Sequence, residues 1–293
     1  MAVRFDPVGT CIYCGKKNTR LNEEHIIPFG LGGQFILPEA SCRACETITA
    51  KFEGVVQRTI YGDFRMRHNL PSRRKKDRPK FRSIGTLGPD GQVSKKDVPV
   101  EEFPAPYWVY TFGQCGILLG SQPDTDVSLW TMKTIHDTQA MDAFIEKHNW
   151  DRTLSFKVMP YHFMRMIAKI AYSFAVALIG YNCFRPLILS PILNGKANVS
   201  YFVGMNEKQE PFGLVHGHDL RIDLQGRTDG TTLLVAHVRL FPFAETPTYH
   251  AVVGEFVDLH QEGIAIEKLI KRQDIQLSRA VGQSIPSFFF TGV

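Results

Sequence analysis

The most regular pattern of hydrophobic positions lies in the second half of the chain. Residues 161–179 are apolar on nearly all sides of a helix, which predicts a buried helix at the centre of a core. A second helix is predicted over residues 137–148. Because strand-like segments follow these helices, residues 100–293 are predicted to form an α+β domain. The predicted strands cover residues 199–203, 219–224, 232–240 and 249–256.

The apolar stretch at residues 167–180 does not predict a membrane span. Lys169 interrupts it and Arg165 precedes it, so it falls short of the ~18 uninterrupted apolar residues that suggest such a span. The first seven residues contain no apolar run of the kind found in secretory signal peptides. The sequence therefore predicts a cytoplasmic protein without a membrane partner.

The N-terminal part is predicted to contain two short strands and a helix. The strands cover residues 21–27 and 35–37, and glycines in the loop between them permit backbone conformations closed to other residues. The helix begins near Cys42 and continues through Phe52 and Val56 at helical spacing. This pattern predicts a small unit over residues 1–62.

Positive charge is concentrated between the two predicted folded parts. Residues 63–82 hold nine Lys or Arg against two Asp, although the whole chain carries a net charge of only +5. Residues 63–99 are polar and contain several turn signals, so they are predicted to form a basic linker with one hairpin. Concentrated positive charge of this kind is attractive to a phosphate backbone.

Four of the six cysteines predict a zinc site. Cys11 and Cys14 form one C-x2-C pair, and Cys42 and Cys45 form another after 27 intervening residues. Two such pairs can close a tetrahedral site on one Zn²⁺, which would stabilise a unit too small for a large core. Four thiolates fill the coordination sphere, so this zinc is structural rather than catalytic. The alternative, four cysteines that bind nothing, is disfavoured by the repeated spacing.

The order of motifs around the cysteines resembles that of the HNH endonucleases. Between the two pairs lies Glu24-His25-Ile26-Ile27-Pro28, followed by a glycine loop. The resemblance is to the zinc-containing branch of the ββα-metal nucleases and covers residues 11–58. It implies a zinc-stapled ββα-metal module, which precedes the larger mixed α+β domain predicted above. The implied activity is metal-dependent hydrolysis of DNA phosphodiester bonds.

The resemblance also implies roles for three side chains. His25 matches the general base, and its ordinary pKa near ~6.5 suits proton abstraction at neutral pH. Glu24 matches the acidic ligand of a catalytic Mg²⁺ or Mn²⁺ ion. The second ligand in the family is commonly Asn directly after the last cysteine, a position held here by Glu46. Glu46 is compatible with Mg²⁺ or Mn²⁺, because such hard ions prefer carboxylate oxygen as a ligand. Glu53 is an alternative to Glu46 as the second ligand.

Basic residues on the predicted helix and in the linker are candidates for contacts with DNA phosphates. The alternative is a solvated linker, since runs of charge are often only that. RNA is not excluded as the substrate. The candidate residues are Arg43, Lys51, Arg58, Arg73, Arg74, Lys75 and Lys76.

Two further questions stay open from the sequence alone. A competing interpretation is a zinc-dependent nucleic-acid-binding protein that kept the cysteines and lost catalysis, which Glu46 in place of Asn favours. Residues 100–293 are expected to serve recognition, regulation or assembly, including a homodimer. Within them, His216 and His218 are a weak candidate for a second metal site, while Cys115 and Cys183 receive no role.

Overall fold

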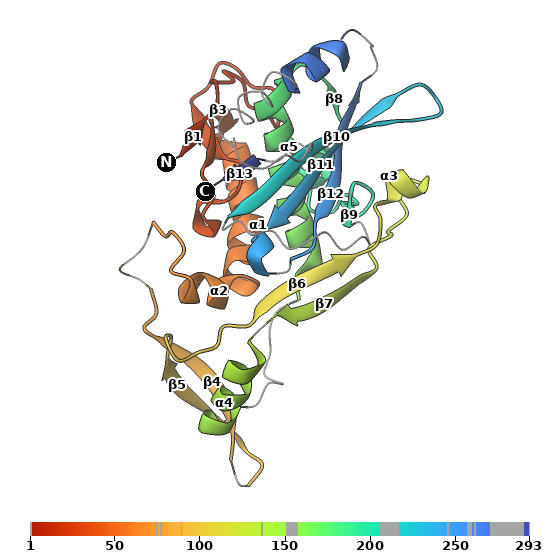
Figure 1. The fold of residues 1–293 in the computed structure, drawn as a ribbon. Coiled ribbons are helices and arrows are strands. Elements are labelled where there is room, and N and C mark those ends of the chain that lie inside the picture. The colour runs from red at the N-terminus through yellow and green to blue at the C-terminus, as the bar shows by residue number, and fades with distance from the viewer. Residues whose placement is uncertain are drawn as a thin grey trace, which may run out of the picture.

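The helix α5 (Pro160–Ile179) lies at the centre of the molecule. In the computed structural model it passes between the N-terminal part of the chain and the largest sheet (Figure 1). Nearly all of its side chains are buried, because it is apolar on all sides. The structure describes residues 2–73, 76, 78–88, 90–135, 137–150, 158–205, 217–244, 246–256, 260, 262–269 and 290–292.

The N-terminal part has the predicted order of two strands and a helix. Strand β2 (Leu21–His25) pairs antiparallel with β3 (Phe35–Cys42), and α1 (Arg43–Thr59) follows directly. The short β1 (Val3–Arg4) adds to β3 in parallel, so the sheet order is β1-β3-β2. A single 3₁₀ turn, η1 (Phe29–Leu31), occupies the glycine loop. The ββα arrangement expected from the sequence is confirmed.

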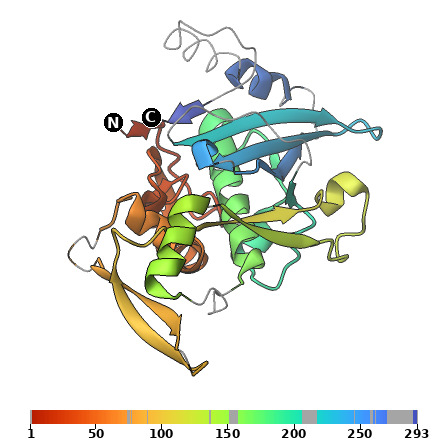
Figure 2. The same cartoon turned by 60° about the horizontal axis from the view of Figure 1, so that its bottom comes forward.

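A hairpin occupies much of the segment predicted as a basic linker. Strands β4 (Phe81–Leu87) and β5 (Val93–Pro99) pair antiparallel and project from the rest of the molecule (Figure 2). A small core between the hairpin and α4 (Thr138–His148) contains Ile84 and Phe144. The nearby elements are α2 (Gly62–Arg67), β6 (Tyr107–Phe112), α3 (Gly116–Leu119) and β7 (Trp130–Ile135).

The largest sheet covers one side of α5. Its strand order is β13-β10-β11-β12-β8, with β9 also paired to β12. Side chains alternate between its two faces, and one face packs on α5. The remaining elements are β8 (Arg185–Pro186), α6 (Leu189–Leu193), β9 (Val203–Met205), β10 (His218–Gly226), β11 (Thr232–Leu240), η3 (Pro242–Ala244), β12 (Tyr249–Phe256) and β13 (Phe290–Gly292).

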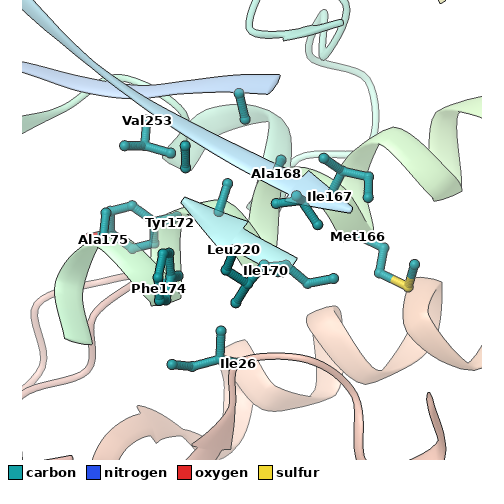
Figure 3. Packing of buried hydrophobic residues seen from close by; sticks show 14 of the residues in the cluster. Ile26, Met166, Ile167, Ala168, Ile170, Tyr172, Phe174, Ala175, Leu220 and Val253 are labelled. Atoms are coloured by element: carbon teal, nitrogen blue, oxygen red, sulfur yellow. The ribbon is translucent and has the colours of Figure 1, made fainter. Parts of the chain in front are cut away.

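The N-terminal part and the large sheet share one hydrophobic core with α5. Ile26, just after β2, is fully buried and faces Ile170 of α5 and Leu220 of β10 (Figure 3). Helix α1 also packs along α5. The domain boundaries predicted at residues 62 and 99 stay a prediction. Among the described residues, side chains of the N-terminal part and of the large sheet belong to the same hydrophobic cluster.

Most predicted elements of the second part are present, with one clear error. The helices and the strands at 219–224, 232–240 and 249–256 are confirmed to within a few residues. The strand predicted at 199–203 is wrong except for Val203, because residues 199–202 form turns. There the Ser200 amide donates to the side-chain oxygen of Asn198 (3.1 Å), a local hydrogen bond that favours a turn over a strand ladder.

Helix α5 is long and apolar enough to cross a membrane by length and composition. However, 89% of the apolar window is buried inside the fold. A helix whose surface is already covered by other parts of the chain is typical of a protein core. This agrees with the prediction made from its sequence.

Candidate active site

The four cysteines converge on one point, as a structural zinc ion requires. The sulfur atoms of Cys11, Cys14, Cys42 and Cys45 all lie within 4.8 Å of one another. Cys14 Sγ and Cys42 Sγ are 3.7 Å apart, close to the ~3.8 Å expected between two corners of a tetrahedron with Zn–S bonds of ~2.3 Å. The donor set therefore fits Zn²⁺. Among the residues that the structure describes, this is the one group of three or more His, Cys, Asp or Glu arranged to hold a metal.

Local backbone geometry presents the cysteines to a common centre. Gly15 closes the first turn with φ +74°, and its amide bonds the Cys11 carbonyl (2.9 Å). Although burial opposes ionisation, hydrogen bonds from the Cys45 amide and from neighbouring thiols lower the pKa of Cys42 to about 7. Burial raises the pKa of Cys45. The four thiols are thus not equivalent before a metal is bound.

Strand β2 sends its neighbouring candidate residues in opposite directions. Glu24 is buried, whereas Glu23 is exposed and His25 is partly exposed. This alternation is the normal period of a strand. Both side chains can therefore reach one phosphate only where the strand ends or bends. Strand β2 ends at His25, and the joint action of Glu24 and His25 stays a prediction.

Glu24 lies in a buried ion pair with the second part of the chain. Its Oε1 is 2.5 Å from Lys169 Nζ on α5, and Glu53 Oε1 is 2.8 Å from the same ammonium. Burial disfavours the charged lysine, but the two carboxylates more than offset this, so the pKa of Lys169 is raised. Burial raises the pKa of Glu24. The predicted role of Glu24 as an ion ligand stays a prediction.

His25 lies at the solvent side of β2, beside a second carboxylate. Its Nε2 is 3.5 Å from Glu23 Oε1, and the ring packs against Phe29 with centroids 5.8 Å apart. Its Nδ1 is buried and has no hydrogen-bond partner among the described residues. Burial lowers the pKa of His25; Glu23 opposes this, while Lys169, Arg73 and Arg4 lower it further. The imidazole is therefore neutral near pH 7, as a base must be.

Glu46 has partners different from those of Glu24. Its Oε2 accepts hydrogen bonds from Asn22 Nδ2 (2.7 Å) and from Arg43 (3.1 Å). Asn22 and Arg43 also line an open hollow of about 360 Å³ together with Thr19 and Arg20. The hollow combines two guanidinium groups with an amide and a hydroxyl. This composition suits an oxygen-rich anion.

The glycine loop after His25 is fixed by close packing. Gly32 has φ +84°, and a Cβ added at Gly33 would lie 2.0 Å from the Ile27 carbonyl oxygen. Arg65 of α2 donates to the Gly30 carbonyl (2.6 Å). The loop therefore requires glycine at these positions and is tied to the segment that follows α1.

The predicted phosphate-binding residues that can be described are exposed. Arg43, Lys51 and Arg58 lie on α1 at spacings that place them on one side of the helix. Arg73 and Lys76 are also exposed, and Arg73 is close enough to His25 to affect its pKa. Arg74 and Lys75 lie outside the described residues.

The weak candidate for a second metal site has another role in the structure. His216 lies outside the described residues. His218 is buried, and its Nε2–H donates to the Leu31 carbonyl in the glycine loop (2.9 Å). Since a carbonyl only accepts, the hydrogen must reside on Nε2. Burial lowers the pKa of His218 to about 4, so it is a neutral anchor for that loop.

Sequence reasoning missed four residues near the site. Glu23 was not assigned a part, although it follows from strand alternation that Glu23 and His25 share a face. Asn22 and Arg20 became relevant only through the hollow next to Glu46. Lys169 carried a visible signal, because a lysine inside an otherwise apolar helix requires a buried counter-charge.

Comparison with known proteins supports the resemblance noted from the motifs. Residues 11–53 match the protein family described as HNH endonuclease. No curated protein and no solved structure matches the chain. The matched segment runs from the first cysteine into α1 and includes Glu24, His25, Glu46 and Glu53. The match is confined to this segment, and it indicates a nuclease-type function with nucleic acid as the substrate class.

Proposed function

We propose that this protein is a metal-dependent endonuclease that hydrolyses DNA phosphodiester bonds, with His25 as its general base. The observation that carries the proposal is the position of the His25 imidazole. It is neutral near pH 7, partly open to solvent, and attached to a strand of the zinc-stapled module. A base in this position can take a proton from a water molecule that attacks phosphorus.

The two ring nitrogens of His25 have different environments. Because Nδ1 is buried, the proposal assigns proton transfer to Nε2. Accepting a proton there makes the ring positive, and Glu23 at 3.5 Å offsets that charge. Glu23 is itself held by Arg4 (2.9 Å). In this proposal Glu23 stabilises the protonated form of the base.

The proposed reaction also uses a divalent ion. Mg²⁺ or Mn²⁺, when bound, would neutralise charge that builds up on the phosphate and on the leaving oxygen. Glu46 is the better placed of the two predicted ligands, because its carboxylate lies at the protein surface between Asn22 and Arg43. Glu24 fits this role poorly while it binds Lys169. Glu46, with the Asn22 amide beside it, is therefore the first position to test for the ion.

The positive charge around the module supports a nucleic acid as the substrate. Arg43 and Arg20 line the hollow beside Glu46, and Arg73 is exposed in the following segment. Such groups bind phosphates without reading sequence. DNA is the proposed substrate and RNA the alternative, since hydrolysis by His25 does not exclude a 2′-hydroxyl. The second candidate function, nucleic-acid binding without catalysis, is favoured by Glu46 in place of the family's usual Asn.

A plasmid-nicking assay with His25→Ala separates these functions. Wild-type protein is expected to nick supercoiled DNA with Mg²⁺ or Mn²⁺ and to stop when EDTA is added, while zinc content is followed by mass spectrometry. His25→Ala should lose activity by about 100-fold or more, since general-base catalysis contributes about 10²–10⁴-fold. Parallel incubation with RNA tests the alternative substrate.

His237→Ala is the matched control. Its imidazole also lies beside a single carboxylate, with Nε2 2.8 Å from Asp223 Oδ2, but it belongs to β11. Its loss should leave nicking unchanged. Equal cleavage by wild type and His25→Ala would remove the catalytic interpretation, and DNA binding without cleavage by wild type would favour the binding protein.

A further inference from the structure

The module is joined to the rest of the protein by side chains that bind its backbone. Tyr172 of α5 donates to the Ile12 carbonyl between the first two cysteines (2.7 Å). His218 of β10 donates to Leu31 in the glycine loop. Lys169 of α5 donates to the carbonyls of two residues at the end of β2. All three donors come from the part of the chain outside the family match.

Lys169 makes the most extensive of these contacts. Its side chain is only 1% exposed, and its ammonium group contacts four acceptors. Two are the carboxylates of Glu24 and Glu53, at 2.5 and 2.8 Å. The others are the carbonyl oxygens of Ile26 (3.3 Å) and of His25 itself. An ammonium group that contacts four acceptors on and around β2 therefore comes from a distant helix.

These contacts hold the His25 backbone in place, and they do so from the buried face of β2. Lys169 holds the His25 backbone through its carbonyl and holds the preceding residue through the Glu24 carboxylate. Because neighbouring side chains on a strand point to opposite faces, a strand anchored inward at Glu24 projects His25 outward. A small rotation of this segment would change how far the ring reaches toward solvent.

We propose that Lys169 is a positioning residue for His25, so that α5 is part of the catalytic apparatus and not only of the core. The proposal rests on the proposed function of His25 as base. It assigns the second part of the chain a task beyond recognition, regulation or assembly. The competing explanation is that Lys169 only stabilises the fold by neutralising two buried carboxylates.

The test compares two variants that separate stability from positioning. Lys169→Met leaves Glu24 and Glu53 without a counter-charge, so it should unfold at a lower urea concentration than wild type. Lys169→Met/Glu53→Gln removes one of the two carboxylates and should regain part of that stability. Neither variant can bind the His25 carbonyl through residue 169. The proposal therefore predicts that stability returns in the double variant while turnover does not.

The expected result is a selective loss of kcat. Both variants should keep one zinc per chain and a KM for DNA near the wild-type value, whereas kcat falls by about 10- to 100-fold, the range expected for a misplaced catalytic group. Lys268→Met is the matched control, because Lys268 also donates to a backbone carbonyl of α5, that of Ile179 (2.8 Å). It should leave kcat unchanged.

A spectroscopic measurement tests the positioning of His25 without relying on enzymatic activity. In protein with ¹⁵N-labelled histidine, the imidazole resonances of His25 should shift in both Lys169 variants and stay in place in Lys268→Met. Recovery of kcat together with stability in the double variant would overturn the proposal, as would unchanged His25 resonances. If wild type does not cleave DNA at all, the proposed function fails, while the resonances still decide whether Lys169 positions His25.

Discussion

Replacing His218 with glutamine should remove a defined part of the pH dependence of stability. His218 is buried in β10, donates through Nε2 to Leu31, and packs against Phe241 with ring centroids 4.6 Å apart. Burial lowers its pKa to about 4, against ~6.5 for an unfolded chain. Glutamine keeps an N–H donor that can reach Leu31 but does not titrate.

The magnitude follows from the two pKa values. Above pH 6.5 the imidazole is neutral in both states, so it adds no pH dependence. Between pH 6.5 and 4 the unfolded chain binds a proton that the folded chain does not, and the free energy of unfolding falls as pH falls. Between pH 7.5 and 5.5 the loss from His218 alone is about 1.4 kcal/mol, rising to about 3 kcal/mol near pH 4.

Urea unfolding followed by circular dichroism at pH 7.5 and 5.5 measures this loss. For wild type and for His218→Gln, the change in unfolding free energy between the two pH values is determined, and the two changes are compared. Protonation of the zinc ligands weakens both proteins in the same way, so it cancels in the comparison. His250→Gln provides a second case, since burial also lowers the pKa of His250 to about 4. An unchanged loss in His218→Gln would refute the idea that burial against Leu31 keeps this imidazole neutral.

Two further predictions concern the metal and the glycine loop. Cys14→Ser should lower bound zinc well below one ion per chain and destabilise the protein, whereas Cys115→Ser should keep one ion. Mass spectrometry measures the zinc content of each variant. Equal zinc content in the two variants would contradict the assigned ligand set. Gly33→Ala should destabilise the protein by about 3 kcal/mol or more in urea unfolding, because the new Cβ would lie 2.0 Å from the Ile27 carbonyl oxygen. Gly226→Ala, where a Cβ meets nothing within 4 Å, is its control, and similar stability of the two variants would argue against a rigid loop.

Local chemistry made much of the fold predictable from the sequence. The helix over α5 and the strands β11 and β12 follow from hydrophobic periodicity, and the ββα unit follows from motif order. The hairpin β6–β7 was not predicted, since its pairing depends on contacts between residues 18 to 28 positions apart rather than on a clear alternating pattern. Pairing between distant segments leaves little trace in local periodicity.

The candidate site was predictable in its parts but not in its arrangement. The four cysteines follow from their spacing, and Glu24 and His25 follow from the motif as residue types. The inward position of Glu24 does not, because it depends on Lys169, which is separated from the strand by more than 140 residues. A motif shared with a family gives the residue types, whereas the partner of each side chain is chosen by the rest of the fold.

That dependence bears on how the module works in this protein. An isolated module would expose Ile26 and leave the carboxylates of Glu24 and Glu53 without their ammonium partner, although all three are covered in the folded chain. Zinc binding can stabilise the part of the module that holds the four cysteines. It cannot supply a positive charge to the buried carboxylates at the other end of β2. The second part of the chain supplies it through Lys169. The arrangement of the site is therefore a property of the whole fold and not of the matched segment alone.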